Sequence, residues 1–175
     1  GREASDHEAH LAEEIGVESR LCDQRQLSQL EPQIDFRASG GVYYPGDAHL
    51  VPSVLVKNLA EYLERNNVLL MPQCELTRFE TAGNKITRIE TNRGPLQADE
   101  FVLASGSWSP LVIRDLGIRM HLQPGKGYSI TTTNPVVKPQ ITMIFSERRV
   151  AVTPFSDRLR FAGTMEFAGM NLDIN

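Results

Sequence analysis

Three small residues, Ala104-Ser105-Gly106, stand at the end of a continuous apolar run, residues 101–104. An apolar run of this kind is typical of a strand that is covered on both faces. Ser109 follows at the distance expected for the cap of a next helix. In open α/β sheets, ligands lie beyond the carboxyl ends of strands, where small residues let them approach the backbone. The pattern therefore favours a ligand-contacting strand and helix, although many buried strands end in this way without a ligand.

Capping residues and apolar spacing predict the helices that surround this unit. A Ser5-x-x-Glu8 capping box predicts a helix that begins at residue 5 and ends near Ile15, before Gly16. Asp23 is expected to cap a short helix that is closed by Pro32. Two further helices are predicted at residues 53–65, from their apolar face, and at residues 109–116, with Pro110 in the first turn and Gly117 after the end.

Short apolar and alternating segments predict a larger number of strands. A three-strand meander is expected from residues 74–80, 85–91 and 95–98, with turns between them. Further strands are expected at residues 42–44, 68–71, 101–104, 128–133, 141–145, 149–153 and 158–162. The predicted fold class is α+β, with a mixed or antiparallel sheet, flanking helices, a β-meander and one strand–helix unit.

Several classes of function are disfavoured by composition. The net charge is −4 and no basic stripe is present, which argues against a nucleic-acid partner. No apolar stretch approaches the length of a membrane span. The four histidines are dispersed, so no metal site is expected. Cys22 and Cys74 lack metal-ligand spacing and are expected to be reduced thiols, which suits a cytoplasmic protein.

A complete dinucleotide-binding motif is absent from the sequence. Gly125-Lys126-Gly127 is the nearest approach to Gly-x-Gly-x-x-Gly, but Ile130 occupies the third glycine position. Phosphate-loop, nucleophile-elbow and His-Glu-x-x-His patterns are also absent.

Four segments nevertheless occur in a recognisable order. They are residues 41–52 (GVYYPGDAHLVP), residues 98–109 with the Ala-Ser-Gly run, residues 124–131 (PGKGYSIT), and residues 152–155 followed by 158–166. Taken together they resemble the central part of FAD-dependent amino acid oxidoreductases of the D-amino acid oxidase superfamily, in particular its D-amino acid dehydrogenase and glycine oxidase branches. The resemblance covers essentially the whole chain.

This resemblance implies a flavoenzyme that oxidatively deaminates D-amino acids to 2-oxo acids. It implies a substrate-domain part at residues 1–45, a partial FAD-binding domain at 46–117 and a substrate-domain sheet at 118–175. Because the family's glycine motif precedes the matching part, the chain is expected to be a fragment of a longer polypeptide that shows neither flavin colour nor turnover by itself. A glycine or sarcosine oxidase, and a non-catalytic module with a decayed flavin site, are the alternatives.

The resemblance also implies which residues contact ligands. The implied cofactor-binding residues are Leu76, Ala104, Ser105, Gly106, Trp108 and Lys126, and the implied substrate-binding residues are His49, Tyr128 and Thr153. A core position for Trp108, a plain surface position for His49 and a solvent-directed Lys126 are the alternatives. Ala151 stands where glycine-oxidase-like relatives carry an aromatic pocket residue, which leaves room for a larger substrate side chain.

No catalytic residue is assigned, because the family's carboxylate-binding arginine is expected beyond residue 175. The arginines at positions 148, 149, 158 and 160 are expected on a solvated sheet face. A small amino acid is the expected partner, with no nucleic acid and no transmembrane segment. A homodimer would cover an exposed sheet edge. The expected location is the cytoplasm, with the peripheral surface of the inner membrane as the alternative.

Overall fold

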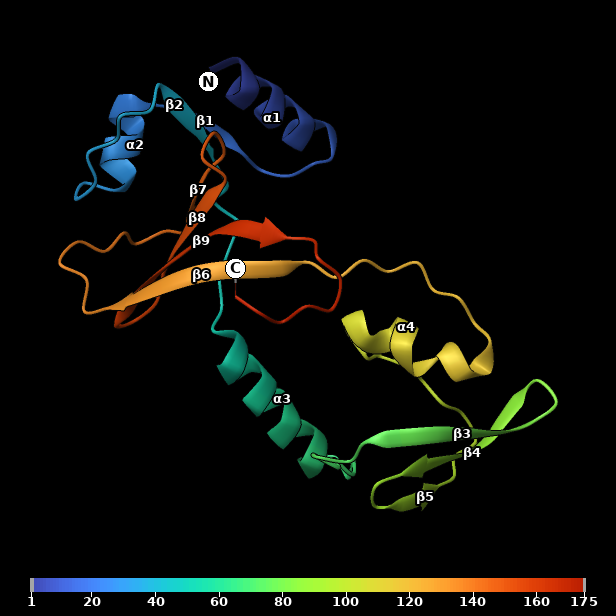
Figure 1. The fold of residues 1–175 in the computed structure, drawn as a ribbon. Helices are drawn as coiled ribbons and strands as arrows, with labels where there is room; N and C mark the ends of the chain where they lie inside the picture. The colour runs from blue at the N-terminus through green and yellow to red at the C-terminus, as the bar shows by residue number, and fades with distance from the viewer. Residues whose placement is uncertain (1, 175) are drawn as a thin grey trace. The chain divides into compact units, whose positions relative to one another are not determined.

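The computed structural model describes residues 2–174, and its elements form two units that are described separately (Figure 1). One unit comprises residues 1–52 and 127–166, and the other comprises residues 53–126 and 167–175. Helices and antiparallel sheets are both present, as predicted, so the α+β fold class is confirmed.

The N-terminal part of the first unit is a two-stranded antiparallel sheet that lies between two helices (Figure 1). The elements are α1 (Arg2–Glu14), β1 (Arg20–Asp23), α2 (Gln24–Leu30) and β2 (Gly40–Tyr43). The Asp23 side chain accepts a hydrogen bond from the Gln26 backbone, and the Gln26 side chain accepts one in return. The predicted cap at Asp23 is therefore confirmed as a reciprocal capping box.

The rest of this unit is a four-stranded sheet with the order β6-β9-β8-β7. The strands are β6 (Lys126–Thr133), β7 (Met143–Phe145), β8 (Val150–Pro154) and β9 (Arg158–Glu166). β8 pairs antiparallel with both β7 and β9. Val152 and Leu159 are buried, whereas their neighbours Arg158 and Arg160 are exposed. This alternation confirms a sheet with one covered face and one solvated face.

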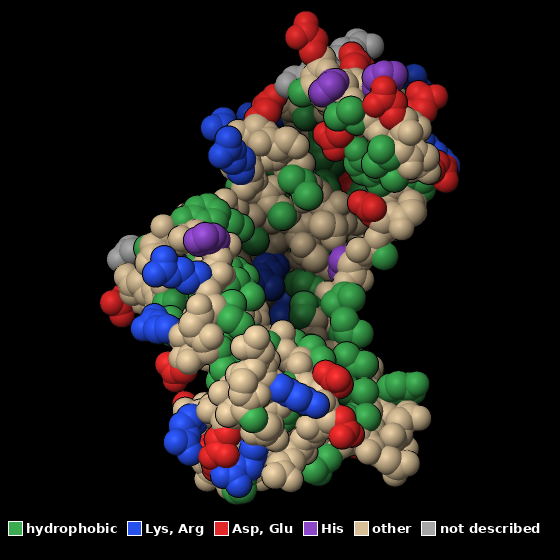
Figure 2. Space-filling model, turned by 90° about the vertical axis from the view of Figure 1, so that its right-hand side faces the viewer, with side chains coloured by type: hydrophobic (Ala, Val, Ile, Leu, Met, Phe, Trp, Pro, Cys, Tyr) green, Lys and Arg blue, Asp and Glu red, His purple; other side chains and the backbone are tan. Residues whose placement is uncertain are grey.

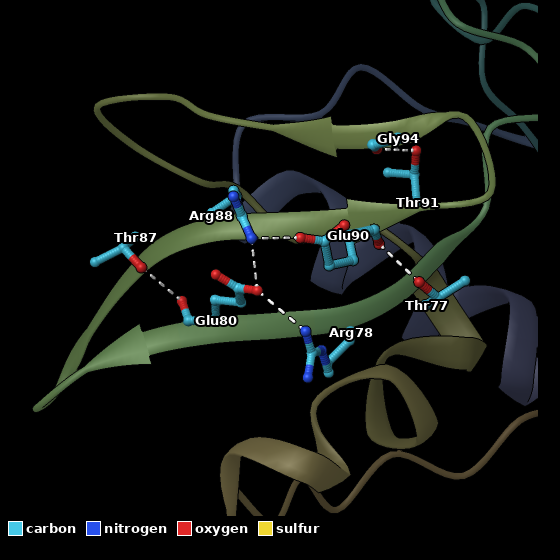
Figure 3. A network of polar contacts seen from close by, with 8 residues as sticks. All are labelled: Thr77, Arg78, Glu80, Thr87, Arg88, Glu90, Thr91 and Gly94. Atoms are coloured by element: carbon cyan, nitrogen blue, oxygen red, sulfur yellow. Dashed lines mark hydrogen bonds and ion pairs between the residues drawn. The ribbon is translucent and has the colours of Figure 1, made fainter.

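The second unit contains α3 (Pro52–Arg65) and the predicted meander of β3 (Leu76–Ala82), β4 (Lys85–Thr91) and β5 (Gly94–Leu96). A polar network crosses this meander (Figure 3). Arg88 on β4 donates to Glu80 on β3 over 2.8 Å and forms an ion pair of 2.9 Å with Glu90. Arg78 donates to the same Glu80 oxygen over 3.0 Å. The network ties the two longer strands together across one face.

The predicted helix at residues 109–116 is shorter than expected. It is divided into η1 (Gly106–Trp108), α4 (Ser109–Val112) and η2 (Arg114–Leu116). Ser109 does not act as the cap, because its hydroxyl lies 3.0 Å from that of Ser105. Gly117 ends the segment with a φ of 71°, as predicted for a helix C-terminus.

Three other local predictions are wrong. Residues 101–104 and 68–71 form no strand, because a strand requires a hydrogen-bonded neighbour and neither run has one within residues 2–174. α1 begins three residues before Ser5, so the capping box is not used at that position. The sequence reading also missed β1, which is recognisable only through its pairing with β2.

Few side chains are buried in either unit. The solvent-accessible surface area of the chain is 13,920 Å². Two separate compact domains, each with half the mass of the chain, would together have only about 10,300 Å². Hydrophobic side chains reach the surface in several places in the view of Figure 2. On α3 they include Leu55, Leu59 and Tyr62, each at least half exposed. The apolar face of this helix is therefore uncovered in the described chain.

Within the described part of the chain, every helix is too short or too polar to cross a lipid bilayer.

Candidate functional site

The predicted cofactor-contacting run is an open loop that leads into η1. Ala104 is exposed and Ser105 is half-buried. Gly106 has a φ of 53°, and a Cβ placed on it would meet no atom within 4 Å. The side chain of Val102, just before this run, is 91% exposed. Small side chains and open space give a ligand access to this backbone, so these residues fit a cofactor that approaches closely.

The other predicted cofactor residues lie on different elements of the same unit. Leu76 is the half-buried first residue of β3, which η2 contacts. Trp108 ends η1 and is 55% exposed in the described chain, and both its contact with a cofactor and its alternative role as a core anchor stay predictions. Lys126 Nζ donates to the backbone oxygen of Asp173 over 2.5 Å. The lysine is therefore held by the chain itself, and its role toward a flavin stays a prediction.

The glycines at positions 125 and 127 do not form a phosphate-binding turn. A dinucleotide motif requires a strand, a glycine turn and then a helix. Here the residues lead directly into β6, which begins at Lys126. This geometry agrees with the incomplete glycine motif in the sequence.

The predicted substrate residue Thr153 lies half-buried on β8, opposite Arg160 of β9. Arg160 is exposed and donates to the hydroxyl of Ser129 on β6 over 2.9 Å. Ala151 lies two residues from Thr153, opposite Ala162. Because alternate residues of a strand share one face, Thr153, Arg160 and the two alanines form a polar and small-residue surface on the sheet.

Tyr128, the second predicted substrate residue, is bound within its own sheet. Its hydroxyl donates to Glu166 Oε2 over 2.5 Å, and both residues are half-buried. A hydrogen bond to a carboxylate is stronger than one between neutral groups. The structure therefore gives the hydroxyl a defined direction at the junction of β6 and β9.

His49, the third predicted substrate residue, lies on the exposed loop between β2 and α3. Its Nδ1 lies 3.2 Å from the Thr142 hydroxyl, and the donor depends on the histidine tautomer. Its ring stands edge-on to Phe155, with 6.0 Å between ring centroids and an interplanar angle of 83°. Two residues next to the ends of β7 and β8 thus orient a side chain that the sequence placed on an open loop.

Sequence reasoning missed Glu31 and Lys138, which hold the two segments that contact His49. Glu31, which caps α2 at its C-terminus, is 1% exposed. Its Oε1 accepts hydrogen bonds from the backbone N–H groups of Gln140 and Ile141, each over 2.6 Å. The ammonium group of Lys138 donates to the backbone oxygens of Phe155 and Ser156. No local signal marks these residues, because their partners lie far away in the sequence.

Two titratable groups of the first unit are shifted by their surroundings. Burial raises the pKa of the Cys22 thiol, and the negative charge of Asp23 adds to this effect. Partial burial raises the pKa of the Tyr44 phenol, and its hydrogen bond to Glu8 raises it further. Neither group is thereby prepared as a nucleophile or base near neutral pH, because both are held in the neutral form.

No grouping of three or more His, Cys, Asp or Glu side chains suited to a metal ion occurs within residues 2–174.

The first unit carries a polar sheet face and the second carries an open Ala-Ser-Gly loop, and comparison with known proteins gives the class. Residues 1–175 match the DAO family, described as FAD dependent oxidoreductase. The chain therefore belongs to this family of FAD-dependent oxidoreductases.

Named relatives are consistent with this membership. The chain is 33% identical to a D-amino acid dehydrogenase of Chromohalobacter salexigens, over 98% of the chain and 42% of the relative. It is 31% identical to a D-amino acid dehydrogenase of Vibrio vulnificus, over 92% of the chain and 40% of the relative. The chain thus spans about two-fifths of the length of these relatives.

Solved structures share the fold. Glycine oxidase from Bacillus cereus superposes with a TM-score of 0.84 at 23% identity, over 99% of this chain and 48% of that one. L-proline dehydrogenase from P. horikoshii superposes with a TM-score of 0.82 at 20% identity, over 94% and 45% of the two chains. At these identities the likeness establishes the fold and leaves the substrate open.

Proposed function

We propose that the protein to which this chain belongs uses FAD to oxidise D-amino acids to 2-oxo acids, with release of ammonia. The observation that carries this proposal is the 33% identity to a D-amino acid dehydrogenase over 98% of the chain. FAD, when bound, supplies the acceptor for the hydride that leaves the substrate α-carbon. The protein's task is then to hold and orient the amino acid and to exclude water.

Residues of the first unit suit that task. We assign substrate contacts to His49, Tyr128 and Thr153, because they combine polar atoms with fixed directions. His49 is oriented by Thr142 and Phe155, and Tyr128 by Glu166. Thr153 lies on a sheet face that also carries Arg160. Hydroxyl and imidazole groups held in this way can bind a carboxylate and an amine without rearrangement.

In the second unit we assign cofactor contacts to Leu76, Ala104, Ser105, Gly106, Trp108 and Lys126. The support is the open backbone at residues 104–106 and the free space at Gly106. We further propose that the uncovered apolar face of α3 and the unpaired run 101–104 are covered by other parts of the longer polypeptide. The chain by itself is then expected to bind no FAD and to show no turnover.

The second candidate is a glycine or sarcosine oxidase, which the fold likeness to glycine oxidase favours. The sheet face favours larger substrates instead. Ala151 lies between Ala162 on β9 and Ile144 on β7. Two methyl side chains at neighbouring positions leave room above the sheet, whereas a glycine-specific pocket requires that space to be filled. The third candidate is a binding module whose flavin site has decayed.

One experiment separates the three candidates. The intact protein is purified, its visible spectrum is recorded, and it is assayed with D- and L-amino acids, glycine and sarcosine. Flavin absorbance together with turnover of larger D-amino acids supports the proposal. Preference for glycine or sarcosine supports the second candidate. Absence of both flavin and turnover supports the decayed module and overturns the proposal.

We also propose a cytoplasmic location, at or near the membrane surface, and a homodimer formed through an exposed sheet edge. The dimer is supported by β6 and β7, which each have only one neighbouring strand in the four-stranded sheet of the described residues. Sedimentation of the intact protein and fractionation of cells that produce it test these two proposals.

A further inference from the structure

We propose that Glu31 is a positioning residue that fixes the substrate-facing His49 through the segment 139–142. The expected effect on substrate binding rests on the proposed function. The structural part of the proposal rests only on contacts within the first unit.

The first step is the anchoring of Glu31 itself. It lies at the C-terminal cap of α2, where its backbone N–H donates to the Leu27 oxygen over 3.0 Å. Its backbone oxygen accepts from the Ile34 N–H over 3.1 Å. With the side chain only 1% exposed, the carboxylate has little freedom to move. Its oxygen atoms are therefore hydrogen-bond acceptors at fixed positions inside the unit.

The second step is the attachment of the segment between β6 and β7. The N–H groups of Gln140 and Ile141 both donate to Glu31 Oε1. Two consecutive amides directed at one carboxylate oxygen form an anion-binding turn. Pro139, directly before them, is fully buried. The segment is thus fixed by a charged acceptor more than 100 residues away in the sequence, and removing that acceptor leaves two partly buried donors unpaired.

The third step links this segment to His49. Thr142 directly follows Ile141, and its hydroxyl lies 3.2 Å from His49 Nδ1. The Phe155 ring stands edge-on to the His49 ring, and Lys138, directly before Pro139, donates to the Phe155 backbone oxygen. Displacing residues 139–142 therefore disturbs both contacts that orient the imidazole. An exposed loop residue that depends on two contacts loses its direction when they move.

The intact flavoprotein tests this inference with three variants. Glu31→Met removes the acceptor at similar length, Glu31→Gln retains an acceptor oxygen, and Thr142→Val removes only the link to His49. Glu100→Met, at an exposed glutamate of the other unit, is the control. Amide exchange of residues 139–142 and the Cε1–Hε1 signal of His49 in histidine-labelled protein are measured, with His49→Asn to identify the signal.

We expect amide exchange at residues 139–142 to accelerate at least tenfold in Glu31→Met and to stay near wild type in Glu31→Gln and in the control. The His49 signal shifts in Glu31→Met and in Thr142→Val. With a D-amino acid substrate, KM rises about tenfold in both variants, as expected for the loss of one well-placed hydrogen bond, and kcat changes less than twofold.

Each contrary outcome has a distinct meaning. Unchanged exchange in Glu31→Met overturns the clamp, and accelerated exchange with an unmoved His49 signal overturns the positioning role. If Glu31→Met does not fold, Glu31→Asp takes its place, because the shorter carboxylate cannot reach both amides. A wild-type protein without D-amino acid turnover overturns the proposed function, whereas exchange and the His49 signal still decide the role of Glu31.

Discussion

The hydroxyl of Tyr128 donates to Glu166 Oε2 over 2.5 Å, and this bond joins the first residues of β6 to the last residue of β9. Their separation of 38 residues makes it a long-range bond. It lies at one end of the four-stranded sheet, where two connections enter and leave the unit. A partly buried bond to a carboxylate contributes more than a neutral surface bond.

Tyr128→Phe is expected to lower the free energy of unfolding of the intact protein by about 1–2 kcal/mol, because the Glu166 carboxylate loses a donor. Urea unfolding measured by circular dichroism tests the value. Tyr43→Phe on β2 is the matched control, because Tyr43 is also half-buried but its hydroxyl forms no hydrogen bond within residues 2–174, and it is expected to change stability by less than about 0.5 kcal/mol. Equal effects of the two changes would contradict a stabilising role for the Tyr128 bond.

The Glu80–Arg88 pair predicts a pH dependence of stability. The hydrogen bond from Arg88 lowers the pKa of Glu80, with the charges of Arg88 and Arg78 acting in the same direction. The carboxylate therefore stabilises the fold above its unfolded pKa, and this contribution is lost as the pH falls through the lower, folded pKa. Urea unfolding of wild type and Arg88→Met at pH 7, 5, 4 and 3 should show a difference that shrinks toward acid.

Arg65→Met is the control for this series, since Arg65 is an exposed helix residue that forms only a 3.5 Å ion pair with Glu61. Its effect on stability should be small at every pH. A difference between wild type and Arg88→Met that stays constant from pH 7 to 3 would exclude the ion pair as its cause. The Nε of Arg88 is buried without a hydrogen-bond partner in the described chain, and this unsatisfied donor offsets part of the stabilisation that the ion pair contributes.

Gly106 provides a test of the cofactor assignment. Gly106→Ala in the intact protein is expected to cost about 1–2 kcal/mol of stability, because alanine is strained at a φ of 53°. We expect it also to weaken FAD binding, since the added methyl group occupies the open space beside residues 104–105. Flavin retention during dialysis and fluorescence titration measure this effect.

Gly83→Ala is the matched control for Gly106→Ala. Gly83 has a φ of 61° and equally open space at its Cβ, but it lies in the turn between β3 and β4. The two changes carry the same backbone strain at different places. Similar stability losses with an unchanged affinity for FAD in both variants would remove Gly106 from the cofactor-binding residues.

The two cysteines are expected to differ in reactivity. Cys22 is 7% exposed, and burial raises the pKa of its thiol, so little thiolate is present near neutral pH. Cys74 is only half-buried. Alkylation by iodoacetamide at pH 7.5, followed by mass spectrometry, should modify Cys74 at least tenfold faster than Cys22, and urea should abolish the difference. Faster modification of Cys22 would contradict its buried environment.

Local features of the chain could be recognised without tertiary information. The capping box of Asp23 and Gln26, the helix at Pro52–Arg65 and the end of the 109–116 segment at Gly117 depend on neighbours within a few residues. The meander was predictable for the same reason, because its turns connect consecutive strands. The α+β class and the FAD-dependent family follow from such local patterns and their order along the chain.

Other features depend on partners that are distant in the sequence. The apolar run 101–104 has the composition of a strand, yet it has no pairing partner within residues 2–174 and stays irregular. β1 was missed because its four residues become a strand only opposite β2. In both cases interstrand hydrogen bonds decide the outcome, and composition cannot report whether they form.

The sequence by itself indicated the family, through a resemblance carried by four ordered segments, and it determined the cap at Asp23 and the helix C-terminus at Gly117, which rest on residue type and short spacing. The ligand-binding residues stay predictions. Tertiary structure alone decided how the side chains are held: Glu31 by amides more than 100 residues away, and His49 by Thr142 and Phe155. The physical reason is that a directed hydrogen bond requires two groups within about 3 Å, and only the folded backbone brings distant residues that close.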